Sequence, residues 1–236
     1  MKRFLATLRW DIQLQFRNGF YYASGFVAAL FIILLRQLPE NVNWGLWWPP
    51  VLLENLVINA FYFMAGLVLL EKREGTLEAQ IITPLRNHEY LLSKVLSLAL
   101  LSLLESVVII IAVSGFQFNF LWMGLGVLLL IAMYALYGFV VVSRYDSINE
   151  FILPSALWVM WFSLPLLYYF DIWRHWILYL HPLQAPLVLM QAAYEPLPAW
   201  KIIYGLTYAL FWVGIAYFFS QRAFYKFVIR KEGTRK

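Results

Sequence analysis

The sequence predicts an all-α integral membrane protein with six transmembrane helices. Hydrophobic residues make up 63% of its 236 residues and charged residues only 13%, and a soluble globule cannot bury that much apolar surface. The apolar residues gather in six stretches close to the length of about 20 residues that a helix needs to cross a bilayer. The chain also holds 11 Trp, 15 Tyr and 19 Phe, an aromatic content typical of repeated crossings of the membrane interface.

The six predicted spans follow one another along the whole chain. They lie at about 20–38, 50–70, 95–115, 120–142, 151–170 and 201–221. At about 20 residues each, they take up roughly half of the sequence and leave no room for a soluble catalytic domain. Residues 1–236 are therefore predicted to form a single transmembrane domain.

Residues 1–19 precede the first span and are predicted to form an amphipathic helix that lies in the membrane interface. One side of this helix carries apolar residues at helical spacing, namely Phe4, Leu5, Leu8, Ile12 and Phe16. Gln15 interrupts the apolar stripe. The alternative is that the segment is a simple basic flank that orients the first span.

The segment 71–94 connects the second span to the third and is predicted to hold a short helix against the membrane face. Gly75 can end the second span because glycine tolerates the left-handed conformation of a helix stop. Thr76 is a candidate N-cap for the short helix. Thr83-Pro84 repeats the signal, with a cap residue before a first-turn proline, and opens the run into the third span.

The basic residues predict the orientation of the chain. Of the 18 Lys and Arg, 15 lie in the N-terminal segment, the 71–94 and 143–150 connections and the tail; the other three are Arg36, Arg174 and Lys201. Basic residues collect on the cytoplasmic side of membrane proteins. We therefore expect a multi-pass protein of the cell membrane with both termini and the 71–94 segment in the cytoplasm. The net charge of +5 then reflects topology, and no nucleic-acid partner is predicted.

The connection 171–200 is the one long segment on the outer side. It is rich in aromatic residues and prolines, and the apolar run between Pro182 and Pro196 is too short to span a bilayer. We expect this run to form a re-entrant hairpin before the last span.

At the 71–94 segment the sequence resembles the ABC-2 family, the membrane subunits of ATP-binding-cassette exporters. The resemblance rests on E-K-R-E-G-T-L-E at 71–78, followed by Thr83-Pro84, Glu89 and Lys94. The first acid stands one position further from the G-T-L-E core than in many members. His181-Pro182-Leu183 is similar to the Asn-Pro-Leu that opens the hairpin in this family, with His181 as a departure.

The resemblance implies a permease subunit of an exporter, and the compact size is similar to drug- or antibiotic-exporter permeases, including those labelled fluoroquinolone exporters. It implies a homo- or heterodimer of permeases, with the translocation path between the two protomers, in contact with membrane lipid and a small hydrophobic substrate. Two separate ABC ATPase subunits would bind ATP and Mg. The residues expected to contact the ATPase are Gly75, Thr76, Leu77, Glu78, Ile81, Thr83 and Pro84. Leu77 and Ile81 would be the apolar anchors in a groove of the ATPase.

Polar residues inside two spans are candidates for a substrate path. Glu54, Asn55 and Asn59 lie in the second span, and Glu105 lies in the third. Acids within a membrane are costly and commonly mark a pathway or a paired contact. The structural alternative places Glu54 in the hydrated outer interface and gives Glu105 a hydrogen bond to a neighbouring helix.

Several classes of chemistry are not supported by the sequence. The chain has no cysteine, and His88, His175 and His181 share no helical face that would bind a metal. It has neither a phosphate-binding loop nor a G-x-S-x-G elbow. The chain is therefore expected to bind no cofactor and to have no enzymatic activity of its own. A stand-alone secondary transporter or channel is the alternative function, and an intramembrane enzyme is a third class that lacks a recognisable catalytic pair.

The orientation can be tested with single cysteines in this cysteine-free chain. Cysteines introduced at Asn87 and Glu195 are expected to react with a membrane-impermeant thiol reagent from opposite sides, because the basic residues place these positions on opposite faces of the membrane. Labelling of both positions from the same side would contradict the predicted topology.

Overall fold

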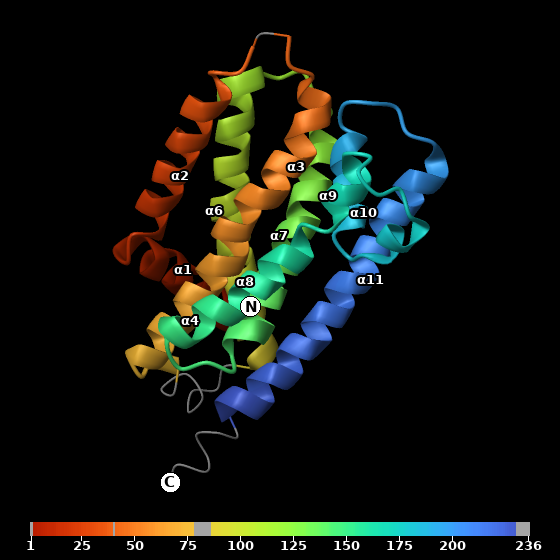
Figure 1. Ribbon diagram of the computed structural model, residues 1–236. Helices are drawn as coiled ribbons and strands as arrows, with labels where there is room; N and C mark the ends of the chain where they lie inside the picture. Colours follow the sequence, from red (N-terminus) through yellow and green to blue (C-terminus); the bar gives the residue numbers. More distant parts are fainter. Residues whose placement is uncertain (1, 40, 78–85, 230–236) are drawn as a thin grey trace.

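The chain folds into a bundle of helices (Figure 1). The computed structural model describes residues 2–39, 41–77 and 86–229, and no β-strand occurs among them. The longer helices are α1 (Lys2–Arg17), α2 (Phe20–Leu35), α3 (Trp44–Leu56), α4 (Phe63–Arg73), α6 (Asn87–Ser114), α7 (Phe120–Val142), α8 (Ile148–Phe162) and α11 (Ala199–Ala223). The shorter ones are the π-helical η1 (Val57–Tyr62), α9 (Pro165–Tyr169), the 3-10 helix η2 (Trp176–Leu180), α10 (Gln184–Gln191) and the π-helical η3 (Phe224–Ile229).

The structure confirms the predicted all-α membrane fold. Five helical stretches of the described chain are long and apolar enough to cross a bilayer, namely Trp44–Arg73, Asn87–Ser114, Phe120–Val142, Ile148–Tyr169 and Ala199–Phe227. They correspond to the second to sixth predicted spans. The first predicted span is α2, whose 16 residues reach only about 24 Å at 1.5 Å per residue. It counts as a sixth crossing only together with α1, to which it is bent by 63°.

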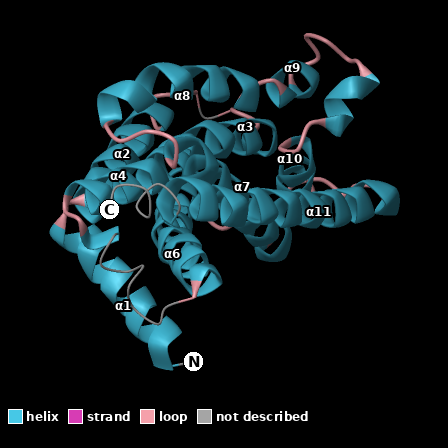
Figure 2. Ribbon diagram, turned by 90° about the horizontal axis from the view of Figure 1, so that it is seen from below, coloured by secondary structure: helices cyan, strands magenta, loops and turns pink. Residues whose placement is uncertain are grey.

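The bend between α1 and α2 is made by Gly19, which has a left-handed φ of 82° that glycine adopts without strain. The apolar stripe of α1 is only partly covered by the bundle: Leu5 and Phe16 are 57% and 54% exposed, whereas Phe4, Leu8 and Ile12 are partly buried. Asp11 and Gln15, which interrupt the stripe, are fully buried against α6, and Leu14 is buried as well. An outward apolar face on a helix at this angle suits an interfacial helix. Figure 2 shows α1 and α8 at opposite edges of the bundle.

The second span is interrupted at its centre by the π-helical segment η1. A π turn leaves backbone carbonyls without their usual intrahelical donors. The Asn59 carbonyl of this segment accepts a hydrogen bond of 3.0 Å from the Ser102 hydroxyl of α6. The Phe61 carbonyl faces Gly138 of α7 so closely that a Cβ there would lie 2.7 Å from it. The π segment therefore fixes the second span against both α6 and α7.

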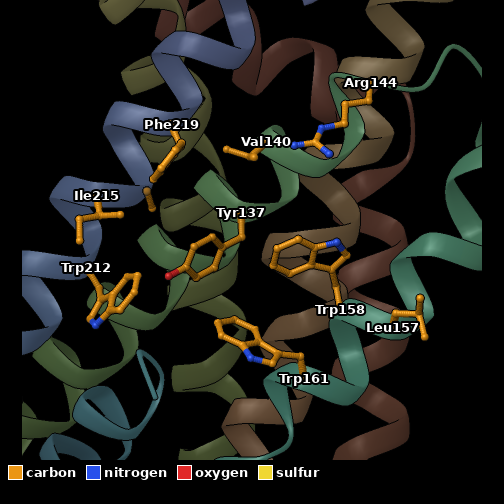
Figure 3. Close-up of a pocket in the computed structure, with 10 residues that line it drawn as sticks. Tyr137, Val140, Arg144, Leu157, Trp158, Trp161, Trp212, Ile215 and Phe219 are labelled. Atoms are coloured by element: carbon orange, nitrogen blue, oxygen red, sulfur yellow. The ribbon is translucent and has the colours of Figure 1, made fainter. Parts of the chain in front are cut away.

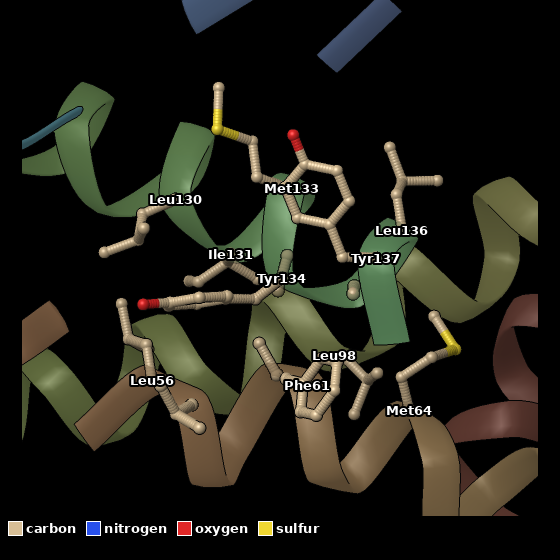
Figure 4. Packing of buried hydrophobic residues seen from close by; sticks show 14 of the residues in the cluster. Leu56, Phe61, Met64, Leu98, Leu130, Ile131, Met133, Tyr134, Leu136 and Tyr137 are labelled. Atoms are coloured by element: carbon tan, nitrogen blue, oxygen red, sulfur yellow. The ribbon is translucent and has the colours of Figure 1, made fainter. Parts of the chain in front are cut away.

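Helix α7 is the centre of the hydrophobic core. It packs against α6, α10, α11 and the second span. Figure 4 shows Leu130, Ile131 and Tyr134 of α7 facing Leu56 and Phe61 of the second span. These five side chains are fully buried, and the Tyr134 hydroxyl donates a hydrogen bond of 3.2 Å to the Leu53 carbonyl. By contrast, little of α8 and α11 is buried, so these two helices lie at the outside of the bundle.

The start of the third span differs from the expectation that Thr83-Pro84 opens its helix. Arg86 is extended, with φ of −83° and ψ of 145°, and α6 begins at Asn87. The carboxylate of Glu89 accepts a hydrogen bond of 3.0 Å from the Arg86 N–H, which satisfies a donor at the helix start. The helix stop at Gly75 is confirmed by its φ of 68°.

The segment after α9 holds the short helix α10, which lies within the bundle against α7 and α11. Seven of its eight residues are buried, from Gln184 to Met190. At eight residues it is too short to cross a bilayer. That it enters the membrane as a re-entrant hairpin stays a prediction.

The close approach of α7 to the second span predicts an asymmetric response of two glycines on one helix. Gly138→Ala is expected to lower the thermal unfolding midpoint in detergent, because its Cβ would press on the Phe61 backbone, and overpacking costs about 1–3 kcal/mol. Gly124→Ala is the matched control, since nothing lies within 4 Å of its Cβ position. It is expected to keep or raise the midpoint because alanine favours a helix by up to about 1 kcal/mol. Equal midpoints for both variants would contradict this packing.

Candidate functional site

A buried ion cluster joins the N-terminal helix to the second and third spans. It consists of Asp11 on α1, Glu71 on α4, and Tyr90, Ser93 and Lys94 on α6. The Lys94 ammonium pairs with both the Asp11 and the Glu71 carboxylates. Ser93 donates a hydrogen bond to Asp11, and Tyr90 donates one of 2.7 Å to Glu71.

The three charged side chains of the ion cluster have no contact with solvent. An isolated charge in such a place would cost several kcal/mol, which only close pairing and complete hydrogen bonding can offset. Two carboxylates share one ammonium, and the two hydroxyls supply donors to the carboxylate oxygens that remain. The arrangement therefore fixes α1, α4 and α6 to one another at the base of the second span.

Lys72, the neighbour of Glu71, makes a second connection from the end of α4. Its ammonium donates hydrogen bonds of 2.9 Å to the Ser143 carbonyl and 2.6 Å to the Tyr145 carbonyl. It also lies 3.6 Å from the Asp146 carboxylate. The loop between α7 and α8 is thus held to the same helix end as the ion cluster. A displacement of this helix end would reach α1, α6 and the α7–α8 loop together.

The predicted ATPase-contacting segment continues directly from this helix end, and only its first part lies in the described chain. Gly75 ends α4, and Thr76 and Leu77 are already helical. Thr76 is therefore the first helical residue and not an N-cap; its hydroxyl donates a hydrogen bond of 3.3 Å to the Glu71 carbonyl. The residues Glu78, Ile81, Thr83 and Pro84 lie outside the described residues.

Leu77 has a different environment from the one expected of an anchor. It is 3% exposed and belongs to the core of this chain. A side chain buried in its own protein cannot fill a groove of a partner without leaving that core. In this conformation Leu77 is an internal packing residue, and Leu77→Asp would disturb folding as well as association.

The candidate path residues separate into two places. Asn55, Asn59 and Glu105 come together: the Asn55 amide donates a hydrogen bond of 3.3 Å to Glu105, and the Asn59 amide donates one of 3.4 Å to the Asn55 carbonyl. Ser24 of α2 donates to the second Glu105 oxygen. Glu105 therefore bonds to neighbouring helices, as the structural alternative predicts. The side-chain oxygens of Asn55 and Asn59 are buried and have no hydrogen-bond partner in the described chain.

Glu54 points to another part of the bundle. It is only partly buried, and its carboxylate accepts a hydrogen bond of 2.8 Å from the Ser163 hydroxyl at the end of α8. Adjacent residues on a helix point about 100° apart, so Glu54 and Asn55 face different neighbours. Glu54 thus joins the second span to the fifth, apart from Glu105.

The described part of the chain contains no group of three His, Asp or Glu residues that could hold a metal ion. Among the histidines, His181 is buried with its ring 4.3 Å from that of Trp161. Its Nδ1 accepts a hydrogen bond of 3.2 Å from the Leu183 N–H. Burial lowers the pKa of His181 to about 4, so the ring is neutral at physiological pH and can cap the turn before α10.

Sequence reasoning missed Asp11 and therefore missed the ion cluster. The sequence identifies Glu71 and Lys94 only as parts of the ABC-2 motif and does not predict that they contact each other. The signal was the interruption of the apolar stripe by Gln15, which is fully buried and donates a hydrogen bond of 2.8 Å to Ser97. Asp11 stands one helical turn before Gln15, so the two polar residues mark one packing face.

Comparisons with known proteins agree with the resemblance seen in the sequence. A family model described as the fluoroquinolones export permease protein family matches residues 2–232. Two relatives from Mycobacterium tuberculosis, one from strain CDC 1551 / Oshkosh and one from strain ATCC 25618 / H37Rv, are both named fluoroquinolones export permease protein. Each is 29% identical over 237 residues, which cover 99% of this chain and 100% of the relative.

The ion cluster predicts a large loss of stability when one charge is removed and a recovery when all are removed. Lys94→Met is expected to lower the free energy of unfolding by about 3–5 kcal/mol, because it leaves two buried carboxylates without a counter-charge. The triple variant Asp11→Asn, Glu71→Gln, Lys94→Met is expected to regain most of this loss.

Denaturant unfolding in detergent measures both variants. Arg73→Met is the control, since Arg73 is an exposed cation at the end of α4, the helix that carries Glu71, and surface charges contribute little. A Lys94→Met variant as stable as the Arg73→Met variant would show that the ion cluster does not hold the helices together.

Proposed function

The chain belongs to the fluoroquinolones export permease protein family, and from this premise we propose that it is the membrane-spanning subunit of an ATP-binding-cassette exporter. It is a multi-pass membrane export permease. The observation that carries the proposal is the family match over residues 2–232 together with relatives that align over the full chain. We propose fluoroquinolones or related hydrophobic and amphipathic compounds as its substrates.

In the proposed exporter, ATP and Mg bind to a separate ATPase subunit. The sequence supports this division because it has no phosphate-binding loop. Two permease protomers, identical or different, would form the dimer that encloses the translocation path. Both termini and the 71–94 segment would face the cytoplasm, in keeping with the distribution of basic residues.

The contacts at the end of α4 support a route for mechanical coupling. The segment from Gly75 to Pro84 would meet the ATPase, and it starts at the helix end that carries both Glu71 and Lys72. The ion cluster connects this end to α1 and α6, and Lys72 connects it to the α7–α8 loop. Because these connections are buried or multiple, a push on the segment would move α1, α4, α6 and the α7–α8 loop together.

A stand-alone secondary transporter remains the alternative, and one observation favours it. The second span has a π-helical interruption beside a buried acid, Glu105, that contacts Asn55 and Ser24. Intramembrane acids beside irregular helix segments occur in ion-coupled transporters. The interruption is mild, however, since the span continues as one helix from Trp44 to Arg73.

Reconstitution into proteoliposomes separates the two functions. The purified chain alone is expected to show no ATP hydrolysis, whereas the chain with its ATPase subunit is expected to hydrolyse ATP and to transport a fluoroquinolone. An ATPase subunit with its phosphate-loop lysine replaced by alanine is the control and should support neither activity. Transport by the chain alone, driven by a proton or sodium gradient, would establish the secondary transporter instead.

A further inference from the structure

An aromatic slot opens between α7, α8 and α11, away from the ion cluster and from Glu105. It has a volume of about 480 Å³, within the range of about 300–1,000 Å³ of small-molecule sites. The side chains that line it are almost all apolar, among them Trp158 and Trp161 of α8 and Trp212, Ile215 and Phe219 of α11, with Arg144 as the charged member. Figure 3 shows these side chains converging on the space between the three helices.

Two residues that line the slot carry a polar atom without a hydrogen-bond partner. The Tyr137 hydroxyl and the Trp212 indole N–H are both buried, and neither has a partner in the described chain. Tyr137 is 9% exposed, and its hydroxyl points toward the Trp212 side of the slot (Figure 3). Buried donors without acceptors are costly, and tyrosine and tryptophan normally find a partner when buried. The Tyr137 hydroxyl is the one that points into the slot, where a ligand with acceptor oxygens would satisfy it.

Cations gather at one end of the slot. Arg144 follows the end of α7, and in Figure 3 its guanidinium extends back toward Val140. Arg222 and Lys226 line the adjoining hollow together with Arg144. Among the described residues, none of these three cations forms a salt bridge with a carboxylate. Their ring contacts, such as Arg222 over Phe218 at 4.7 Å, leave their positive charge free to attract an anion.

The slot faces the surface that the two outermost helices present to their surroundings. Leu157 on α8 and Phe219 on α11 both line the slot, and they are 70% and 51% exposed. Such apolar faces on membrane-spanning helices contact lipid or another membrane helix. A molecule could thus enter the slot sideways from the bilayer, with its charged end at the cations.

We propose that the slot is a binding site for an anionic phospholipid. The phosphate would pair with Arg144, Arg222 and Lys226, and an acyl chain would lie between the tryptophans of α8 and α11. An ester carbonyl, which follows the phosphate in the lipid, would accept a hydrogen bond from the Tyr137 hydroxyl. The spacing fits, because Tyr137 lies one helical turn, about 5 Å, beyond Val140, where the guanidinium ends. Basic pockets between membrane helices on the cytoplasmic side suit anionic headgroups.

Native mass spectrometry of the detergent-purified protein, titrated with phosphatidylglycerol or phosphatidylcholine, tests the proposal. The wild type is expected to bind phosphatidylglycerol more tightly than phosphatidylcholine. Arg144→Gln is expected to weaken phosphatidylglycerol binding about fivefold, the effect of one cation near a membrane surface. Ile215→Trp keeps every charge but fills the slot, and it is expected to weaken binding of both lipids.

The matched control is Arg9→Gln, which removes the same charge from an exposed position on α1. It should bind phosphatidylglycerol within twofold of the wild type, and thermal unfolding midpoints should confirm that all variants are folded. Equal binding of the two lipids by the wild type, or unchanged phosphatidylglycerol binding by both Arg144→Gln and Ile215→Trp, would overturn the proposal. Loss of fluoroquinolone binding in these variants with unchanged lipid binding would also overturn it and assign the slot to substrate.

Discussion

The pairing of Lys94 with two carboxylates is the interaction on which the arrangement of the helices depends. A buried ammonium requires counter-charges within contact distance, and here they come from α1 and α4. The same face of α6 continues with Ser97, Ser102 and Glu105, which bond to α1, η1 and α2. At the far end of the bundle, Arg36 at the end of α2 donates hydrogen bonds to the Ala112 carbonyl. Helix α6 thus holds its neighbours by polar contacts along most of its length.

The sequence predicts the spans well because a bilayer demands long apolar helices regardless of how they pack. It predicts the packing faces poorly for the same reason. In water an apolar stripe marks the buried side of a helix, but beside lipid the apolar side can face outward and the polar side can face the protein. On α1 the polar Asp11 and Gln15 are buried together with Leu14, while Leu5 and Phe16 are exposed. An amphipathic pattern alone does not distinguish these two orientations.

The candidate site shows which contacts local sequence can reveal. The separation of Glu54 from Asn55 follows from helix geometry, and the left-handed Gly75 follows from residue type. Local sequence does not predict the burial of Leu77 or the contact of Asp11 with Lys94, because each depends on how helices distant in sequence are placed. The aromatic slot is a further case, since its walls come from α7, α8 and α11 and its residues are unremarkable within each helix.

The π-helical segment η1 also sets the rotational phase of the second span. Asn55 before it and Glu71 after it both contact α6, through Glu105 and Lys94. In an uninterrupted α-helix, side chains 16 positions apart would point about 160° away from each other. A π turn takes up one additional residue and reduces this angle to about 60°. The additional residue therefore lets Asn55 and Glu71 both contact α6. An uninterrupted α-helix would place these two side chains on nearly opposite sides.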